Sequence, residues 1–544
     1  SGQLTKSGAG SLVMSGTNTY TGATAVNEGT LKAGVATTGA NGAFGNASAV
    51  TMANVASTIL DITGFNNTIG SITGGGATGG NVTLGAATLT IGADNTSPAA
   101  YAGIISGTSG IITKSGTGIL ILSGTNTYTG ATNVNAGVLN VQNAQGTGTT
   151  SGGVTVASGA ALALQGGITV GAEALTLSGT GPDGNAALDN ISGNNTWGGA
   201  ITLAAASTIR NQSNTLSMSG TVDLSTFQLS LGGSTTSGTG IISGVISGTG
   251  SVRKVTAGGV WTLSNANTYT GGTLLAAGTL NINNAQALGT TATAGTFTIG
   301  NAGSVAIDNT SGSTITTNNY QISLADDFSF IGTNPLNLGT GNVSLVANRS
   351  ITVSASTLTL GGVVSGAFSL AKAGGGTLAL SAASGNNTAN TYTGGTTINT
   401  GGSGTIFVTG LNNITSASIT SSTQSVTFST STPANGTYQL LPGTLSVGTQ
   451  SFSSNAATSK AVSFNYTNST VTVATAALNA VTLGSALSNT YGTASTPGIA
   501  FTASGTLSPG VTITATPNSG YEVSVTNSTS GFSSSAITFL VASL

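Results

Sequence analysis

Eleven carboxylate side chains are the residues of this 544-residue chain that could carry acid–base chemistry or hold a metal ion. Glycoside cleavage needs two carboxyl groups about 5–10 Å apart, and a calcium site needs several oxygen ligands around one point. Here the acids are scattered: only Asp326 and Asp327 are adjacent, and neighbours on a strand face opposite ways. Asp308 and Asp327 could meet if they lay one coil apart, but loop polarity is the interpretation that we favour. We therefore expect no catalytic site, no metal site and no cofactor.

Other reactive residue types are absent or sparse. The chain has no His and no Cys, which removes the Ser-His-Asp triad, the thiolate nucleophile and the commonest metal ligand. A Ser–Lys dyad needs a buried lysine, and we expect the lysines that precede Gly-rich turns to be exposed strand ends instead. Nine Lys and Arg residues cannot form a patch that follows a phosphate backbone, so nucleic-acid binding is disfavoured. No Gly-rich turn is followed by the Gly-Lys-Ser/Thr signature of a nucleotide loop.

These lysines (Lys6, Lys114, Lys254 and Lys372) belong to a long segment that occurs four times, at residues 3–35, 111–140, 251–282 and 369–399. Each copy contains the Lys, a Gly-rich turn, an alternating apolar–polar strand, a polar corner Asn-Thr-Tyr-Thr-Gly and a second alternating strand. The fourth copy has a short insertion before its corner. Recurrence at a long period is typical of stacked repeat architectures, in which each unit packs only on its neighbours.

The Asn and Tyr of the corner are the candidate site residues of the repeat. They are Asn18, Tyr20, Asn126, Tyr128, Asn267, Tyr269, Asn390 and Tyr392. Exposed tyrosines could stack on glycans. We favour a structural role, in which each Tyr covers a corner of its coil and its hydroxyl bonds a loop carbonyl.

The composition predicts an ordered all-β protein. The chain has 85 Gly, 4% charged residues, a net charge of −2 and a mean hydropathy of +0.29, whereas disordered chains combine low hydropathy with high net charge. Alternating runs such as residues 81–92 are typical of half-buried strands, and helical periodicity is nearly absent. No signal peptide or membrane-spanning run is visible.

The repeat pattern, with its Lys, Gly-rich turn and Asn-Thr-Tyr-Thr-Gly corner, resembles the autotransporter-associated β-strand repeat of bacterial surface proteins. The resemblance implies a right-handed parallel β-solenoid that is displayed outside the cell, and the repeat brings no catalytic residues with it. Residues 488–524 look like an immunoglobulin-like module of large secreted bacterial proteins. No translocator barrel follows the repeats, so the resemblance leaves the route of secretion unsupported.

Three domains are predicted: a β-solenoid over 1–404, a β-rich cap over 405–475 and an immunoglobulin-like β-sandwich over 476–544. The change is marked by the end of the repeat signature and by five of the eight Pro residues, which fall beyond residue 430. The first copy lacks an upstream strand that the later copies carry, and the last module shows fewer strands than a complete sandwich. We expect both ends to be unfinished.

The most economical hypothesis is a structural extracellular protein, a rigid rod that serves as a fibre, stalk or sheath. Unfinished ends would allow head-to-tail self-association into a filament. The alternative is the stalk of an adhesin that binds glycans or neighbouring surfaces. A polysaccharide-active enzyme is the third hypothesis, and the scattered acids disfavour it. We expect no membrane span.

Overall fold

The computed structural model describes residues 2–394 apart from 235–237, 291–294, 301–302 and 382–389, and beyond residue 394 the backbone of strands β46 to β59. The chain divides into two compact units, residues 1–311 and 312–544. Both contain strands and no helix in the part that the structure describes. No helix there is long and apolar enough to cross a membrane.

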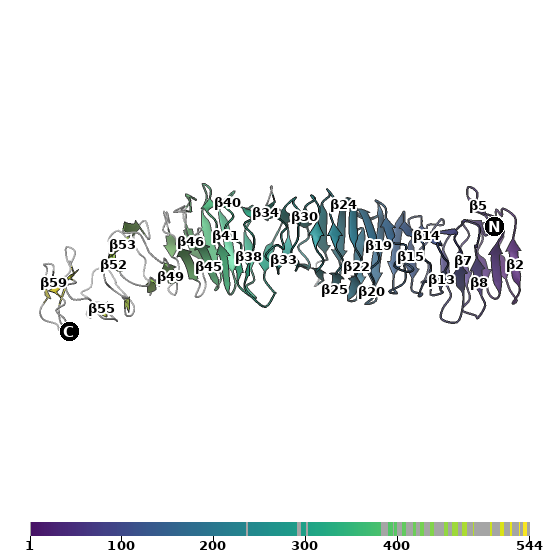
Figure 1. Cartoon of the computed structure of the whole chain (residues 1–544), viewed down its shortest axis with the longest axis horizontal. Coiled ribbons are helices and arrows are strands. Elements are labelled where there is room, and N and C mark those ends of the chain that lie inside the picture. Colours follow the sequence, from purple (N-terminus) through teal and green to yellow (C-terminus); the bar gives the residue numbers. More distant parts are fainter. Residues whose placement is uncertain are drawn as a thin grey trace. The chain divides into compact units, whose positions relative to one another are not determined.

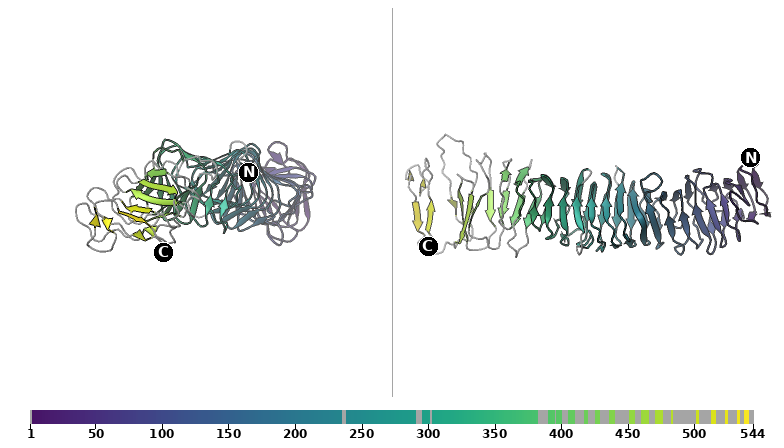
Figure 2. Two further views of the ribbon diagram at one scale, coloured as in Figure 1. Left: turned by 60° about the vertical axis from the view of Figure 1, so that its left-hand side comes forward. Right: turned by 90° about the horizontal axis from the view of Figure 1, so that it is seen from above.

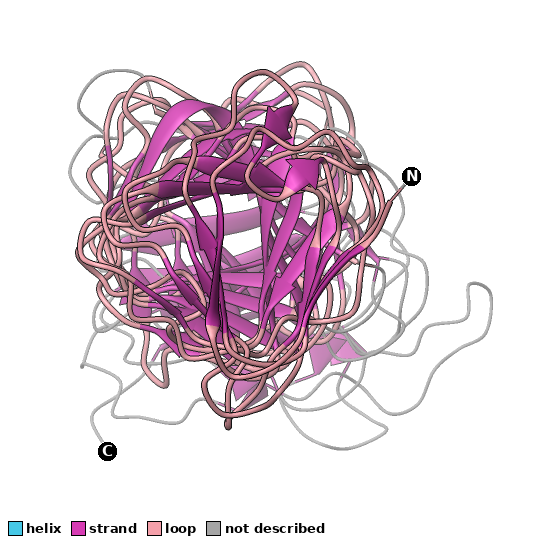
Figure 3. Cartoon of the chain, turned by 90° about the vertical axis from the view of Figure 1, so that its right-hand side faces the viewer, coloured by secondary structure: helices cyan, strands magenta, loops and turns pink. Residues whose placement is uncertain are grey.

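The first unit is a β-solenoid, in which the chain winds into coils whose strands pair in parallel with those of the next coil. Paired residues lie 19 to 29 positions apart, as in Ser11↔Thr30 and Thr30↔Ile59. Figure 1 shows these strands side by side from purple to teal, and Figure 2 shows the same stack from above. Viewed from the N-terminal end, the strands surround a common interior (Figure 3). The prediction of an all-β parallel solenoid is confirmed.

Paired strands form columns along the first unit. Two short columns begin the unit and are, in pairing order, β1 (Leu4–Lys6), β3 (Thr24–Val26), β7 (Val50–Met52) and β10 (Ile72–Gly74), and then β2 (Ser11–Met14), β4 (Thr30–Ala33), β8 (Ile59–Asp61), β11 (Asn81–Thr83) and β13 (Ile105–Ser106). Two longer columns share β24: the first is β9 (Asn67–Ile69), β12 (Thr88–Ile91), β14 (Ile111–Lys114), β16 (Thr132–Val134), β18 (Val154–Val156), β21 (Leu175–Gly179), β24 (Ile201–Asn211), β26 (Val222–Asp223) and β29 (Ile246–Ser247), and the second is β15 (Ile119–Leu122), β17 (Gly137–Val141), β19 (Ala160–Gln165), β22 (Leu188–Ser192), β24, β27 (Leu229–Gly233), β30 (Val252–Lys254), β32 (Thr273–Leu275) and β34 (Thr296–Ile299). The fifth column is β20 (Thr169–Val170), β23 (Asn195–Trp197), β25 (Thr215–Met218), β28 (Thr239–Ile242), β31 (Val260–Leu263), β33 (Gly278–Ile282) and β35 (Val305–Asp308). A short hairpin joins β5 (Asn41–Gly42) to β6 (Gly45–Asn46).

The second unit begins with the same parallel pairing. Its columns are β37 (Gln321–Leu324), β40 (Val343–Leu345) and β43 (Val364–Ser365); β38 (Phe328–Phe330), β41 (Arg349–Val353), β44 (Leu370–Ala373), β46 (Thr396–Asn399) and β48 (Ala417–Ile419); and β36 (Ile315–Thr316), β39 (Leu336–Asn337), β42 (Thr357–Leu360), β45 (Thr377–Ser381), β47 (Thr405–Thr409), β49 (Ser425–Phe428) and β51 (Ser451–Ser454).

The remaining described strands of the second unit form antiparallel pairs. They join β50 (Gly436–Gln439) and β52 (Lys460–Asn465) to β53 (Thr470–Thr475), β54 (Thr482–Leu483) to β55 (Phe501–Thr502), β56 (Thr512–Ala515) to β59 (Ile537–Leu540), and β57 (Val523–Ser524) to β58 (Phe532–Ser533). The predicted cap (405–475) and immunoglobulin-like module (476–544) otherwise lie outside the described residues.

Because the strands of a column pair in register, inward side chains stack on inward ones and outward side chains on outward ones. Inward positions of the β9–β29 column are mostly apolar: the row Leu89, Ile112, Thr132, Val154 and Leu175 has Thr132 as its one polar member, and all five side chains are at most 2% exposed. Outward positions of the same column form a polar row of Thr90, Thr113, Asn133, Thr155, Thr176 and Thr202. Because successive strands lie about 4.8 Å apart, the inward side chains fill the space between coils, and each coil depends on its neighbours for its core.

Candidate functional site

The lysine of the repeat is buried in every copy, so the prediction of exposed strand ends is wrong. Relative exposure is 6% for Lys6, 1% for Lys114, 1% for Lys254 and 0% for Lys372. The reason is the strand alternation: Ile112 and Lys114 lie two positions apart on β14, and both point inward. A buried ammonium is tolerated only where its protons meet acceptors.

Backbone carbonyls supply these acceptors. In the second copy, Lys114 Nζ donates to the carbonyls of Ser115 (2.5 Å) and Gly116 (2.8 Å) in its own turn, and to the carbonyl of Ala136 (3.1 Å) on the next coil. We call Lys Nζ and its carbonyl acceptors the lysine site. The equivalent acceptors are Ser7, Gly8 and Glu28 for Lys6; Thr256, Gly258 and Ala277 for Lys254; and Ala373 and Gly374 for Lys372.

The lysine site explains the glycine that begins the strand of the next coil. Gly137 follows Ala136 and has φ +63°; a Cβ there would lie 2.4 Å from the carbonyl oxygen of Gly118 and 2.8 Å from Lys114 Nζ. Any side chain would therefore displace the ammonium, besides straining the backbone. The same contact occurs in the third copy, where a Cβ at Gly278 would lie 2.5 Å from Lys254 Nζ.

The lysine site is structural rather than catalytic. Burial lowers the pKa of Lys114, Lys254 and Lys372 to about 8, so each remains mostly an ammonium at pH 7. Among the described residues, the hydrogen bonds of Nζ at the four sites all end on backbone carbonyls. Since no serine hydroxyl shares these contacts, the described residues contain no Ser–Lys dyad at the repeat.

The corner asparagine links three successive coils. Asn126 Oδ1 accepts the backbone N–H of Ile105 (2.9 Å) on the preceding coil, and its Nδ2 donates to the carbonyl of Gly146 (2.7 Å) on the following one. Asn267 repeats both bonds with Ile246 (2.8 Å) and Ala287 (2.6 Å). Further members of the set are Asn390, which accepts from Val364, and Asn18, which donates to Ala43.

The corner tyrosine is turned into the solenoid. Tyr128, Tyr269 and Tyr392 are 0%, 1% and 2% exposed, while Tyr20 is half-buried. Each hydroxyl of the first three copies pairs with the threonine four residues later: Tyr20 with Thr24 (2.8 Å), Tyr128 with Thr132 (2.6 Å) and Tyr269 with Thr273 (2.5 Å). A sugar ring cannot reach the three buried aromatic faces, so they do not offer a stacking platform for glycans.

Asp308 and Asp327, the acids of the predicted pair, belong to different units. Asp308 is buried in β35 of the first unit, whereas Asp327 lies in the second, where its Oδ1 accepts the N–H of Ser350 (2.8 Å). Asp326 Oδ1 accepts the N–H of Asp327 itself (2.9 Å). No three potential metal ligands gather anywhere among the described residues. The predicted Asp308–Asp327 pair spans the two units and stays untested.

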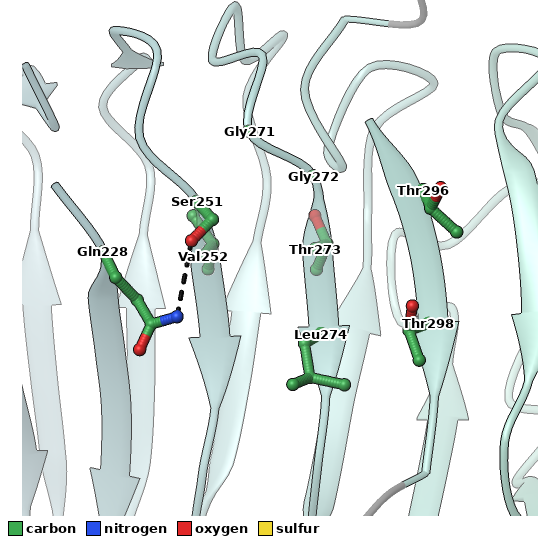
Figure 4. A pocket seen from close by; sticks show the side chains of 9 residues that line it. All are labelled: Gln228, Ser251, Val252, Gly271, Gly272, Thr273, Leu274, Thr296 and Thr298. Carbon is green, nitrogen blue, oxygen red and sulfur yellow. Dashed lines mark hydrogen bonds between the residues drawn. The ribbon is translucent and has the colours of Figure 1, made fainter. Parts of the chain in front are cut away.

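A shallow groove of about 230 Å³ lies over the corner of the third copy (Figure 4). It is lined by Gln228, Ser251, Val252, Gly271, Gly272, Thr273, Leu274, Thr296 and Thr298. Gln228 Nε2 lies 3.5 Å from Ser251 Oγ, and no charged residue lines the groove. Hydroxyls and an amide beside an apolar Leu274 can contact a neutral polar ligand, but they supply no acid, base or nucleophile activated by a base.

Comparison with known proteins identifies the repeat. The model of the passenger-associated-transport-repeat family matches residues 4–33, 112–141, 258–282 and 370–403, which overlap the four recurring segments. The adhesin BmaC autotransporter of Brucella suis biovar 1 (strain 1330) is 34% identical over 233 residues, which are 40% of this chain and 6% of that protein. No solved structure matches the chain.

The family match covers most of each recurring segment. The predicted resemblance to repeats of autotransporter passengers is confirmed, and the immunoglobulin-like likeness has no counterpart among the matches. The repeat family and the adhesin relative indicate a secreted protein of the bacterial cell surface. This chain spans only a small part of that relative's length.

Proposed function

We propose that this chain is a stalk segment of a bacterial surface protein, and that its function is mechanical. The observation that carries the proposal is the lysine site, which ties successive coils together in the first three copies of the repeat. Such bonds lie between backbone and buried side chains, where solvent ions screen them little. A stalk built this way would keep its shape in variable surroundings outside the cell.

The composition of the surface also supports a stalk segment. The outward row from Thr90 to Thr202 is neutral and polar, and the whole chain has only 4% charged residues. Two described acids form ion pairs, Arg210–Asp189 (2.6 Å) and Lys32–Asp61 (2.8 Å), and Asp94 and Asp223 accept backbone N–H groups within turns. We propose no enzymatic activity for this segment.

A second candidate function is weak binding of a neutral glycan, which the groove over the third copy favours. Its hydroxyl and amide lining, with the apolar residues Val252 and Leu274, has the chemistry of a site for an uncharged sugar. The relative is an adhesin by name, but its matched region is a small part of that protein. Binding would then be a property added to the stalk.

Electron micrographs of the purified chain over a range of concentrations test the stalk proposal. We expect elongated single particles; continuous fibres would favour end-to-end assembly of the stalk, and compact globules would contradict the proposal. A glycan array tests the second candidate. A hit that disappears in Ser251→Trp, which fills the groove, and survives in Thr155→Trp, which alters an exposed outward position, would assign glycan binding to the groove.

A further inference from the structure

Glu173 is a buried acid whose side chain points into the solenoid. It lies between β20 and β21, where its neighbours Gly171, Ala172 and Ala174 are exposed, but Glu173 itself is 1% exposed. Its N–H donates to the carbonyl of Gly171 (2.8 Å), which makes a tight turn. The next coil crosses directly over this turn: a Cβ on Gly199 would lie 1.8 Å from the carbonyl oxygen of Glu173. The turn of Glu173 and the backbone of the next coil are therefore in direct contact.

The carboxyl group has one partner for its two oxygens. Oε2 accepts the hydroxyl of Thr147 (2.5 Å), and Oε1 has no hydrogen-bond partner although it is buried. The carbonyl of Thr147 accepts the hydroxyl of Thr132 (2.9 Å), which is paired with Tyr128. A continuous polar row thus runs from the corner tyrosine of the second copy to Glu173, two coils away.

No cation balances this carboxyl in the described structure. The ion pairs of the described residues are Lys32–Asp61 and Arg210–Asp189, and neither includes Glu173. Of the groups that face it, Thr132 and Thr147 do not titrate. Tyr128 does, and the charge of Glu173 adds to the burial that raises the pKa of Tyr128. Tyr128 is therefore neutral over the range in which Glu173 changes its charge.

In the described residues of the first and third copies, no such row leads from the corner tyrosine to an acid. Gly45, Gly148 and Gly289 each lie against the tyrosine of their own corner, which aligns the three copies. The residue before this glycine is Phe44 in the first copy and Leu288 in the third, 0% and 2% exposed. In the second copy it is Thr147, the partner of Glu173. The apolar residue of the first and third copies is therefore replaced in the second copy by a threonine that bonds a titratable carboxyl group.

We propose that Glu173 is a proton-controlled switch on the coils that enclose it: its neutral carboxyl leaves them closed, and its ionised carboxylate drives them to open so that it reaches water. An unpaired carboxylate oxygen in an apolar interior is far more costly than an unpaired carboxyl oxygen. Burial accordingly raises the pKa of Glu173 to about 7, against the opposing effect of the Thr147 hydrogen bond.

The direction of the switch follows from proton linkage. A carboxyl whose pKa is raised in the closed state holds more protons there than in the open state between the ordinary pKa of Glu and about 7. The closed state therefore loses stability as the pH rises through this window, and the loss is complete above it. The coils around Glu173 should be tight in mildly acidic surroundings and open more often at neutral pH and above.

Hydrogen exchange of the full chain between pH 5 and pH 8, corrected for the intrinsic rate, tests the switch. We expect the opening constant of amides in residues 126–149 and 171–177 to rise by up to tenfold per pH unit and to level off near pH 7. Amides in residues 267–290, the equivalent corner of the third copy, are the internal control and should not change. Equal pH dependence in both corners, or none in either, would overturn the proposal.

Two kinds of variant separate a switch from a merely structural acid. Glu173→Gln and Glu173→Met remove the titration, and their exchange should no longer depend on pH. Thr147→Val removes the hydrogen bond that favours the charged form, so the levelling point should move to higher pH. An unchanged profile in both Glu173 variants would overturn the proposal, and if neither variant folds, the Thr147→Val shift and the comparison of the two wild-type corners decide.

Discussion

Lys114 and Ala136 meet across two successive coils: the Nζ of the first donates to the carbonyl of the second over 3.1 Å. The same relationship joins Lys6 to Glu28 (2.9 Å) and Lys254 to Ala277 (3.3 Å). In each copy the lysine also bonds carbonyls of its own turn. One side chain therefore fixes the shape of a turn and its distance from the next coil.

Replacement of Lys114 by Met should destabilise the coils around it by about 3 kcal/mol, because buried carbonyls that lose their donor cost about 1–3 kcal/mol each. Coils of a solenoid open locally, so hydrogen exchange of residues 111–141 is the measurement, and protection there should fall roughly 100-fold. Lys32→Met is the control: Lys32 is 38% exposed and paired with Asp61, and loss of an exposed ion pair costs at most about 1 kcal/mol. Equal effects in the two variants would contradict a special role for the lysine site.

The lysine site shows where sequence reasoning succeeds and where it stops. Alternation along β14 predicts that Lys114 points inward, as Ile112 does. Lysine is so rarely buried, however, that an exposed side chain was the stronger expectation. The acceptors come from a turn and from the next coil, and pairing distances between coils vary too much to be read from the sequence. The solenoid was predictable because the alternation within strands and the recurrence of the four segments can both be seen directly in the sequence.

Glu173 had no signal of this kind. It stands alone in a Gly- and Ala-rich loop, outside any alternating run and outside the four recurring segments. Its burial depends on Thr147, 26 residues earlier, and on Gly199 of the next coil. The corner residues Asn126 and Tyr128 were found because they recur, although recurrence did not show that the asparagine bonds to coils on both sides.

Replacement of Asn126 by Ala should weaken the stack by about 2 kcal/mol, because Ile105 N–H and Gly146 C=O each lose a partner inside the solenoid. Exchange should accelerate on both flanking coils, near residue 105 and near residue 146. Asn133→Ala is the matched control, since Asn133 lies at an outward, half-buried position of β16, and we expect a change within about 0.5 kcal/mol. Acceleration confined to one flank would show that Asn126 does not bridge the two coils.

Replacement of Gly148 by Ala should be far more costly than replacement of Gly159. Both glycines have positive φ, +90° and +80°, so both variants strain the backbone by roughly 1 kcal/mol. A Cβ at Gly148 would also lie 2.7 Å from the carbonyl oxygen of Tyr128 and 2.8 Å from its ring, whereas nothing lies within 4 Å of one at Gly159. Thermal unfolding followed by circular dichroism should show a clear drop for Gly148→Ala and a small one for Gly159→Ala. Similar drops would mean that the tyrosine corner yields to the added methyl group.

Alkaline pH should stabilise the coils that hold Lys254. Burial lowers its pKa to about 8 from the ordinary 10.5, so between these values the unfolded state binds more protons than the folded one. Stability therefore rises with pH in this window, by at most about 1.4 kcal/mol per pH unit. Glu173 adds nothing there, because its own window ends near pH 7.

The fluorescence of Trp261 can report on the coils that hold Lys254. Trp261 lies on β31, the strand that follows Lys254, and Trp197 lies on β23 among coils without a buried lysine; both indoles are 0% exposed. Denaturant unfolding at pH 8, 9 and 10, followed by Trp261 fluorescence in a Trp197→Phe background, should give a midpoint that rises with pH. The Trp197 signal in a Trp261→Phe background should stay level, and Lys254→Met should flatten the Trp261 response. A falling Trp261 midpoint would mean that the neutral amine, with one donor fewer for its carbonyls, holds the coils less well than the buried ammonium.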